Sequence, residues 1–143
     1  MKISELPNAP KWLLDASTDR ADVEWNAESH DYVVWRGGVW RGGDWRGGVW
    51  HGGDWCGGVW HDGVWLGGVW RGESIQNNLL NVLGLRWPIT ISDTRMQVGC
   101  ELHTFPEWES FDDERINKMD RGALKFWRQH KAALMALCGS RAG

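Results

Sequence analysis

A tryptophan stands at every fifth position between residues 35 and 70, in a segment that runs from Val33 to Gly72. Each five-residue unit reads small residue, Val or Asp, Trp, variable residue and Gly, with Asp62 once in the last position. Glycine at two of five positions excludes an α-helix, since each interior glycine costs about 1 kcal/mol. A period of five also does not match the two-residue alternation of a flat strand. The pattern predicts a chain that turns a corner every five residues, with glycines at positive φ.

The units resemble those of pentapeptide-repeat proteins, which form a four-sided right-handed β-helix. The unit Gly38-Val39-Trp40-Arg41-Gly42 matches the spacing of that family. It departs from the family by having Trp in place of Leu or Phe and Gly in place of a small Ala. We interpret the two departures as coupled, because loss of the methyl group makes room for the larger ring. The resemblance implies four units per coil and about two coils.

In a four-sided coil, residues twenty apart stack on one another. This register predicts Arg41 over His61 and His51 over Arg71, which gives two opposite faces a basic ladder. The other two faces, Arg36 over Cys56 and Arg46 over Leu66, lose their charge in the second coil. Because a stack this short needs protected ends, we expect the flanking segments, a second copy, or both to cover it, and hence a homo-oligomer.

The flanks read as caps, which predicts a mainly β fold: a short pentapeptide-type β-solenoid with α+β caps and C-terminal helices. The predicted boundaries are 1–32 for an N-terminal cap of turns and a short helix, 33–72 for the solenoid and 73–143 for the C-terminal cap. Within the last segment we predict an amphipathic helix over 73–83, a hairpin over 87–98 that turns at 92–94, a short helix opened by Thr104 or Pro106, a helix start at Asp112 and Asp113, and a final helix over 123–137.

The C-terminal segment resembles a module that follows short glycine-rich repeats in phage and prophage proteins. The resemblance rests on Val98-Gly99-Cys100-Glu101-Leu102-His103, Glu107-Trp108, Phe111-Asp112-Asp113, Met119-Asp120 and Phe126-Trp127. With the repeat, it covers about residues 33 to 138. It implies a phage origin and assigns no activity.

Composition narrows the function classes. The chain has 143 residues and a net charge of −3, which disfavours a binder of long nucleic acids. It contains no run of 18 apolar residues, and its start lacks the pattern of a signal peptide, so we expect no membrane span. Three separated cysteines indicate reduced thiols. We therefore expect a cytoplasmic protein, in the host cytoplasm if a phage encodes it.

Motifs for catalysis or metal binding are weak. Cys100 and His103 have a spacing that zinc sites use, but only His130 and Cys138 offer a distant second pair. A Cys–His nucleophile would also need a third member and an oxyanion donor, and neither is recognisable. Asp112, Asp113 and Glu114 are better explained by a helix start. The sequence predicts no enzyme, no metal and no cofactor.

The tryptophans have two interpretations, namely inward-facing rings that fill the repeat, or exposed rings that stack on flat ligands. The Trp-Arg-Gly-Gly strings are also similar to disordered RNA-binding RGG segments, but Asp44, Asp54 and the strict period argue against that reading. A duplex mimic is disfavoured too, because basic residues outnumber acidic ones in the repeat.

The function hypothesis at this point is a phage-type anti-defence protein that sequesters a nucleotide immune signal without cleaving it. Cyclic dinucleotides and ADP-ribose-type molecules are the expected small anionic ligands. Tryptophans would sandwich the base and cations would pair with phosphates. The candidate ligand-binding residues are Arg41, Trp45, His51, Trp55, His61, Arg71, Arg86 and Arg95. The alternatives are a protein-binding inhibitor of a host defence complex, similar to anti-CRISPR proteins, and a structural repeat protein with no ligand.

Overall fold

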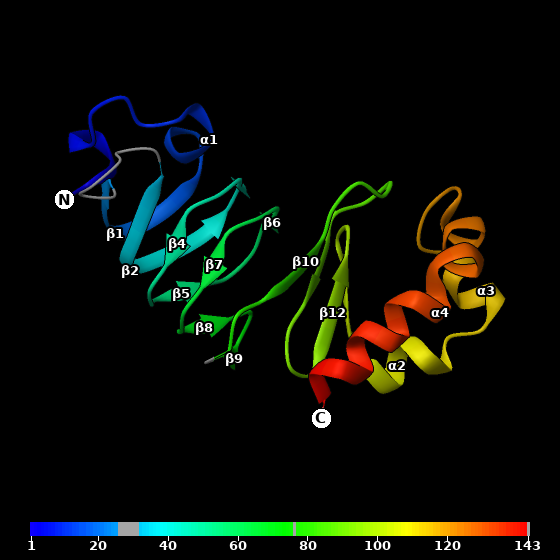
Figure 1. Ribbon diagram of the computed structural model, residues 1–143. Helices are drawn as coiled ribbons and strands as arrows, with labels where there is room; N and C mark the ends of the chain where they lie inside the picture. Colours follow the sequence, from blue (N-terminus) through cyan, green and yellow to red (C-terminus); the bar gives the residue numbers. More distant parts are fainter. Residues whose placement is uncertain (26–31, 76, 143) are drawn as a thin grey trace. The chain divides into compact units, whose positions relative to one another are not determined.

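Short strands dominate the computed structural model of the chain, which describes residues 1–25, 32–75 and 77–142 (Figure 1). A few short helices and one long C-terminal helix accompany them. The chain divides into two units, Met1–Asn81 and Val82–Gly143.

The first unit contains the tryptophan repeat and its flanks. Its elements are η1 (Ile3–Glu5), α1 (Lys11–Leu14), β1 (Ser17–Trp25), β2 (Val33–Gly42), β3 (Asp44–Trp45), β4 (Val49–Trp50), β5 (Asp54–Trp55), β6 (Val59–Trp60), β7 (Val64–Trp65), β8 (Val69–Trp70) and β9 (Glu73–Ser74). From β3 to β8 each strand is the Val-Trp or Asp-Trp pair of one repeat unit. The glycines between these pairs form the turns.

The repeat strands pair in parallel with the strand fifteen residues further along. Trp35 is paired with Trp50, Trp40 with Trp55, and Trp50 in turn with Trp65. Three units therefore separate paired strands, where the sequence analysis expected four. The four-sided, two-coil register is wrong. The physical reason lies in the rings: Trp35, Trp40 and Trp45 each contact the other two, with centroids 5.7 to 6.4 Å apart, so three indoles fill the interior.

The change of register also changes the side-chain ladders. Arg41 does not lie over His61, and His51 does not lie over Arg71, as the twenty-residue register required. Backbone hydrogen bonds from His51 N to Trp35 O and from Cys56 N to Trp40 O follow the fifteen-residue spacing instead. The ladders are therefore Arg36–His51–Leu66, Arg41–Cys56–Arg71 and Arg46–His61. The predicted pair of basic faces is not formed.

All eight repeat tryptophans face inward. Their side chains are at most 2% exposed. Paired rings such as Trp35 and Trp50 stack nearly parallel, with centroids 4.7 Å apart, and rings of successive units meet edge to face. Each aromatic pair contributes about 0.5–1.5 kcal/mol beyond its buried area. Of the two interpretations of the tryptophans, the filled interior is confirmed.

The flanks cover both ends of this stack. At one end the ring of Trp12 packs edge-on against Trp45 at 5.2 Å, and β1 pairs antiparallel with β2. At the other end the indole N–H of Trp65 donates to Ile75 O at 2.9 Å, and its backbone N–H donates to Asn78 Oδ1 at 2.8 Å. The homo-oligomer stays a prediction, but open ends no longer argue for it.

The helix predicted over 73–83 is not formed. Glu73 and Ser74 instead form β9, which pairs antiparallel with β8, and Leu80–Val82 forms β10. The apolar spacing that indicated a helix places Ile75 and Leu79 in the core all the same. The pairing of β9 with the edge strand β8 outweighs the weak helical preference of this segment. β1 was not predicted either.

From Gly48 to Gly68, the first glycine of each unit makes the close approach between turns. Gly63 and Gly68 have φ of 127° and 120°, and a Cβ on either would lie 2.6 Å from the carbonyl oxygen of the glycine fifteen residues earlier. The positive φ expected from the sequence is confirmed, and L-residues rarely adopt it. The sequence analysis attributed the missing methyl group to room for the ring, but the atom nearest to such a methyl group belongs to the backbone of the preceding turn.

Two adjacent glycines provide a matched test of this constraint. Gly48 has φ of 118° and a Cβ there would overlap Val33 O, whereas a Cβ on Gly47 meets nothing within 4 Å. We expect Gly48→Ala to lower the free energy of unfolding by about 2–4 kcal/mol and Gly47→Ala to change it by less than about 1 kcal/mol. Thermal and urea unfolding of both variants measure this. Equal effects of the two substitutions would contradict it.

The second unit combines a small sheet with three helices. The sheet contains β11 (Ile89–Ile91), β12 (Arg95–Val98) and β13 (Glu101–Thr104), in that order. The predicted hairpin is confirmed, since β11 pairs antiparallel with β12 and Ser92 Oγ accepts from Thr94 N and Arg95 N in the turn. β13 was not predicted.

The helix starts are also confirmed. Thr104 caps α2 (Phe105–Ser110), and Asp112 caps α3 (Asp113–Asn117) by accepting from Arg115 N. The last helix, α4 (Ala123–Ala142), begins where predicted and extends five residues beyond the predicted end at 137. Its buried residues are Ala123, Phe126, Trp127, Leu134 and Cys138, and Ala133 is exposed. No helix in the described ranges is long and apolar enough to cross a membrane.

Cys138 reports on the packing of this unit. Its thiol is 1% exposed, lies 3.8 Å from Met96 Sδ, and burial raises its pKa to about 11. Cys56 and Cys100 are exposed.

At pH 8 we expect a disulfide reagent to modify Cys56 and Cys100 rapidly and Cys138 only on unfolding. The fold favours the neutral thiol of Cys138. The contribution of this thiol to the free energy of unfolding is therefore complete below about pH 8.5 and is lost as the pH rises toward 11. Counting modified thiols with time by mass spectrometry measures this, with a Cys138→Ala variant to identify the slow site. Equally rapid modification of all three cysteines in the native protein would contradict the burial of Cys138.

Candidate functional site

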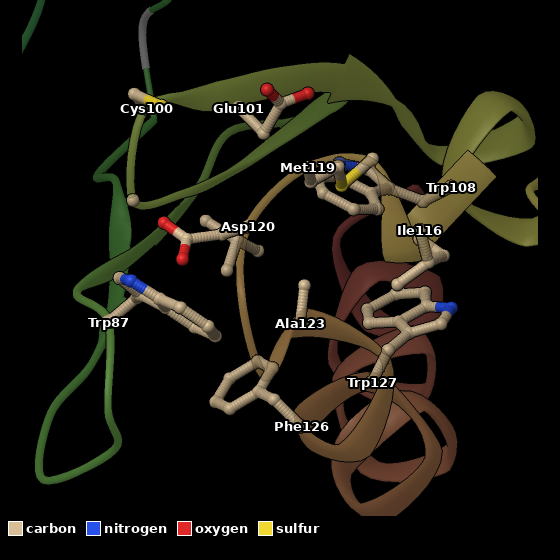
Figure 2. Close-up of a pocket in the computed structure, with 12 residues that line it drawn as sticks. Trp87, Cys100, Glu101, Trp108, Ile116, Met119, Asp120, Ala123, Phe126 and Trp127 are labelled. Carbon is tan, nitrogen blue, oxygen red and sulfur yellow. The ribbon is translucent and has the colours of Figure 1, made fainter. Parts of the chain in front are cut away.

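An aromatic pocket opens in the second unit between the sheet and the helices (Figure 2). It contains about 440 Å³ of space including its open mouth. Twelve residues line it: Trp87, Val98, Gly99, Cys100, Glu101, Trp108, Ile116, Met119, Asp120, Ala123, Phe126 and Trp127. Nine of these twelve belong to the segments on which the resemblance to the phage module rests.

Four aromatic rings form most of the walls. Trp87 meets Phe126 edge to face with centroids 5.1 Å apart, and Trp108 lies 5.1 Å from Trp127. Figure 2 shows Trp87 and Phe126 on one side of Ala123, and Trp108 and Trp127 on the other. The indole N–H of Trp108 donates to Met96 O at 2.7 Å, which fixes that ring against the sheet. Trp87 is only half-buried and forms part of the mouth.

The charged residues of the lining are both carboxylates. Glu101 Oε1 lies 2.9 Å from His103 Nε2 and 3.7 Å from Arg115 Nη2, so its charge is shared with two cationic partners when His103 is protonated. Asp120 is exposed, and no ion pair to its carboxylate is found among the described residues. In Figure 2 that carboxylate lies on the same side of the pocket as Trp87 and Cys100.

Arg86 lies beside the pocket without lining it. Its guanidinium stands over the ring of Trp87, 4.5 Å from the centroid. Its Nη1 also approaches Gly122, in the turn between α3 and α4, so closely that a Cβ on Gly122 would overlap it. Arg86 is therefore the one predicted binding residue that the described structure brings next to this pocket. Arg95 lies in β12, half-buried.

The other predicted binding residues lie in the first unit and do not converge. Trp45 and Trp55 are buried, so a ligand cannot stack on their faces without opening the repeat. Arg41 and Arg71 share one ladder with Cys56 between them, and His51 and His61 belong to the other two. Arg41 Nη2 lies 3.6 Å from Asp19 Oδ2, and His61 Nε2 lies 3.1 Å from Asp44 Oδ1. Arg71 Nη2 donates to Gly58 O.

The pocket was not predicted from the sequence. Its lining comes from β12–β13, α2, α3 and α4, and only the fold brings these elements together. The sequence analysis singled out nine of the lining residues for a resemblance to a phage module, but treated them only as an indication of origin. Cys100 and His103, singled out for their zinc-like spacing, both lie near the pocket. Among the described residues no group of three or more His, Cys, Asp and Glu is arranged to hold a metal ion.

The cap of α2 holds Trp108 in the pocket wall. The backbone N–H of Thr104 donates to Glu107 Oε1 at 2.8 Å, and the Thr104 hydroxyl accepts from Glu107 N. The backbone N–H of Thr104, and next its hydroxyl, lower the pKa of Glu107.

This pKa shift predicts an acid-sensitive cap. A lowered pKa means that the Glu107 carboxylate stabilises the native state above its unfolded pKa of about 4.3, and that this stabilisation is lost as the pH falls through the native pKa. We expect Glu107→Gln to lower Tm at pH 6.5 and to have little effect at pH 3. Melting curves of both proteins across this range measure it. A Tm difference that does not change with pH would contradict the role of the charge.

Comparison with known proteins adds no relative to this picture. No protein-family model, no curated protein and no solved structure matches the chain significantly. The functional reading of the pocket therefore rests on its own residues.

Proposed function

We propose that the protein is a binding protein and not an enzyme, and that the aromatic pocket of the second unit is its ligand site. The observation that carries the proposal is the convergence of four aromatic rings on a cleft whose lining includes two carboxylates. Such a combination of apolar walls with a few polar groups is typical of sites for small ligands and side chains. The mostly apolar lining supports binding over catalysis.

The size of the pocket limits what enters it. The inner cavity of the pocket has a volume of about 50 Å³. For comparison, a cavity of about 150 Å³ in another protein binds benzene. The inner pocket therefore suits a short apolar chain, and a larger flat ring would rest at the mouth against Trp87. A partner's side chain, or a small molecule with an aliphatic end, has the right dimensions.

We further infer that the repeat is a short β-solenoid with three units per turn that acts as a rigid scaffold. The fifteen-residue register supports this reading. The buried tryptophans make the repeat itself a poor place for ligand stacking.

A filled pocket tests the proposal. Ala123 lines the pocket, and Ala133 lies exposed on the same helix. Leucine is a good helix former at both positions. We expect 1-butanol to shift the indole N–H signals of Trp87, Trp108 and Trp127 in ¹⁵N-labelled protein. Ala123→Leu should abolish these shifts and Ala133→Leu should preserve them. Shifts that survive in the folded Ala123→Leu protein, or that spread evenly over all tryptophans, would overturn the proposal.

A second candidate function is the sequestration of a nucleotide immune signal by a phage-type anti-defence protein. The position of Arg86 over Trp87 favours it, because a base at the pocket mouth would have a cation beside it for a phosphate. The two lining carboxylates oppose an anionic ligand.

Titration with cyclic dinucleotides and cyclic ADP-ribose isomers, followed by tryptophan fluorescence and Tm, tests the nucleotide reading. We expect a stabilised protein whose response is weakened by Arg86→Gln. No change in fluorescence or Tm with any of these nucleotides would exclude the nucleotide reading. Capture of a single host protein would then favour the inhibitor of a defence complex.

A further inference from the structure

We infer that the aromatic pocket selects an alkylammonium group on a short apolar stem, an inference that rests on the pocket being the ligand site. A lysine side chain and a free alkylamine share this chemistry. The apolar stem would lie against the rings, and the charged end would meet Asp120 at the mouth.

The first support is the sign of the charge. The two charged residues of the lining, Glu101 and Asp120, are both carboxylates, and Arg86 stands over Trp87 outside the lining. Glu101 is already shared with His103 and Arg115. The Asp120 carboxylate has no ion-pair partner among the described residues, so a cation that arrives at the mouth displaces no existing pair.

The second support is the chemistry of the walls. The electron-rich face of an indole or phenyl ring attracts an ammonium group, and the attraction grows as water is excluded. Trp87 is half-buried and Asp120 exposed, and both lie on the same side of the pocket in Figure 2, whereas Phe126, Trp108 and Trp127 are buried. A carboxylate and an aromatic face therefore border the same opening. A neutral chain of the same size gains only from the apolar walls.

The third support is the volume. An inner space of about 50 Å³ accepts a few methylene groups and is too small for a fused ring system. A four-carbon stem that ends in an ammonium group places its carbons inside and its charge at the mouth. Long cationic side chains commonly bury their stems and keep their charged ends in water.

The test compares two probes that differ only in charge. The full-length ¹⁵N-labelled protein is titrated with n-butylammonium chloride and with 1-butanol at matched ionic strength. The readout is the indole N–H signals of Trp87, Trp108 and Trp127, assigned with single Trp→Phe variants. We expect n-butylammonium to bind about fivefold more tightly than 1-butanol, the ratio typical of one exposed charge pair.

Two carboxylate variants locate the source of the preference. Asp120→Asn should remove most of the preference for n-butylammonium, because only the attraction of the aromatic rings remains, and it should leave 1-butanol binding unchanged. Glu114→Gln removes the same charge from α3, where Glu114 lies 3.3 Å from Lys118 outside the pocket, and should preserve the preference. A preference lost equally in both variants would show only a general charge effect and would overturn the inference.

The outcomes separate this inference from the function on which it rests. Equal binding of both probes, or tighter binding of 1-butanol, would overturn the ammonium selectivity and leave the pocket as a ligand site. Binding of neither probe would overturn both. A third titration with Nα-acetyl-lysine N-methylamide separates the two sources. Affinity equal to that of n-butylammonium would assign the pocket to a partner's lysine, and weaker binding would assign it to a free amine.

Discussion

The close approach of backbones at the first glycine of each repeat unit is the constraint on which the first unit depends. At the corners from Gly48 to Gly68, a carbonyl oxygen of the preceding turn occupies the place where a side chain would project. Hydrogen bonds from Val59 N to Gly43 O and from Val64 N to Gly48 O, 3.0 and 2.9 Å long, join the turns there. They hold successive turns at the usual distance between paired strands, about 4.8 Å. Indole rings that follow this spacing stack face to face, with centroids 4.7 to 5.4 Å apart.

The same constraint explains why three units and not four complete one turn. Glycine before each Val or Asp leaves no side chain at that corner, so only the indoles have to be accommodated inside. Three rings that each touch the other two close the section without a void. A four-sided section would separate the rings on opposite sides, and unfilled interior space is costly. The spacing of the tryptophans shows the period of five in the sequence itself, but the number of sides depends on ring packing.

Local signals in the second unit were predictable, and long-range pairing was not. The Thr104 and Asp112 caps and the turn at Ser92 depend on hydrogen bonds within a few residues, and all three are found where the sequence placed them. The segment 73–83 has the apolar spacing of a helix, but its first residues pair with the edge of β8 as strand β9. β1 pairs with β2, and no short-range sequence pattern predicts that pairing. The pocket likewise combines residues from β12 to α4, which no spacing rule connects.

The distribution of tryptophans between core and surface determines where binding can occur. In the repeat, stacking and edge contacts between the indole rings cover their faces. The eight regularly spaced tryptophans therefore stabilise the repeat and are not accessible to a ligand. In the second unit, Trp87 keeps part of its ring at the surface because Arg86 and Phe126 hold it from two sides, and the nearby turn after α3 carries Asp120. The half-buried Trp87 and the exposed Asp120, which has no ion-pair partner among the described residues, can still contact a ligand, whereas the eight buried rings cannot. The proposed binding site therefore lies in the unit with far fewer tryptophans.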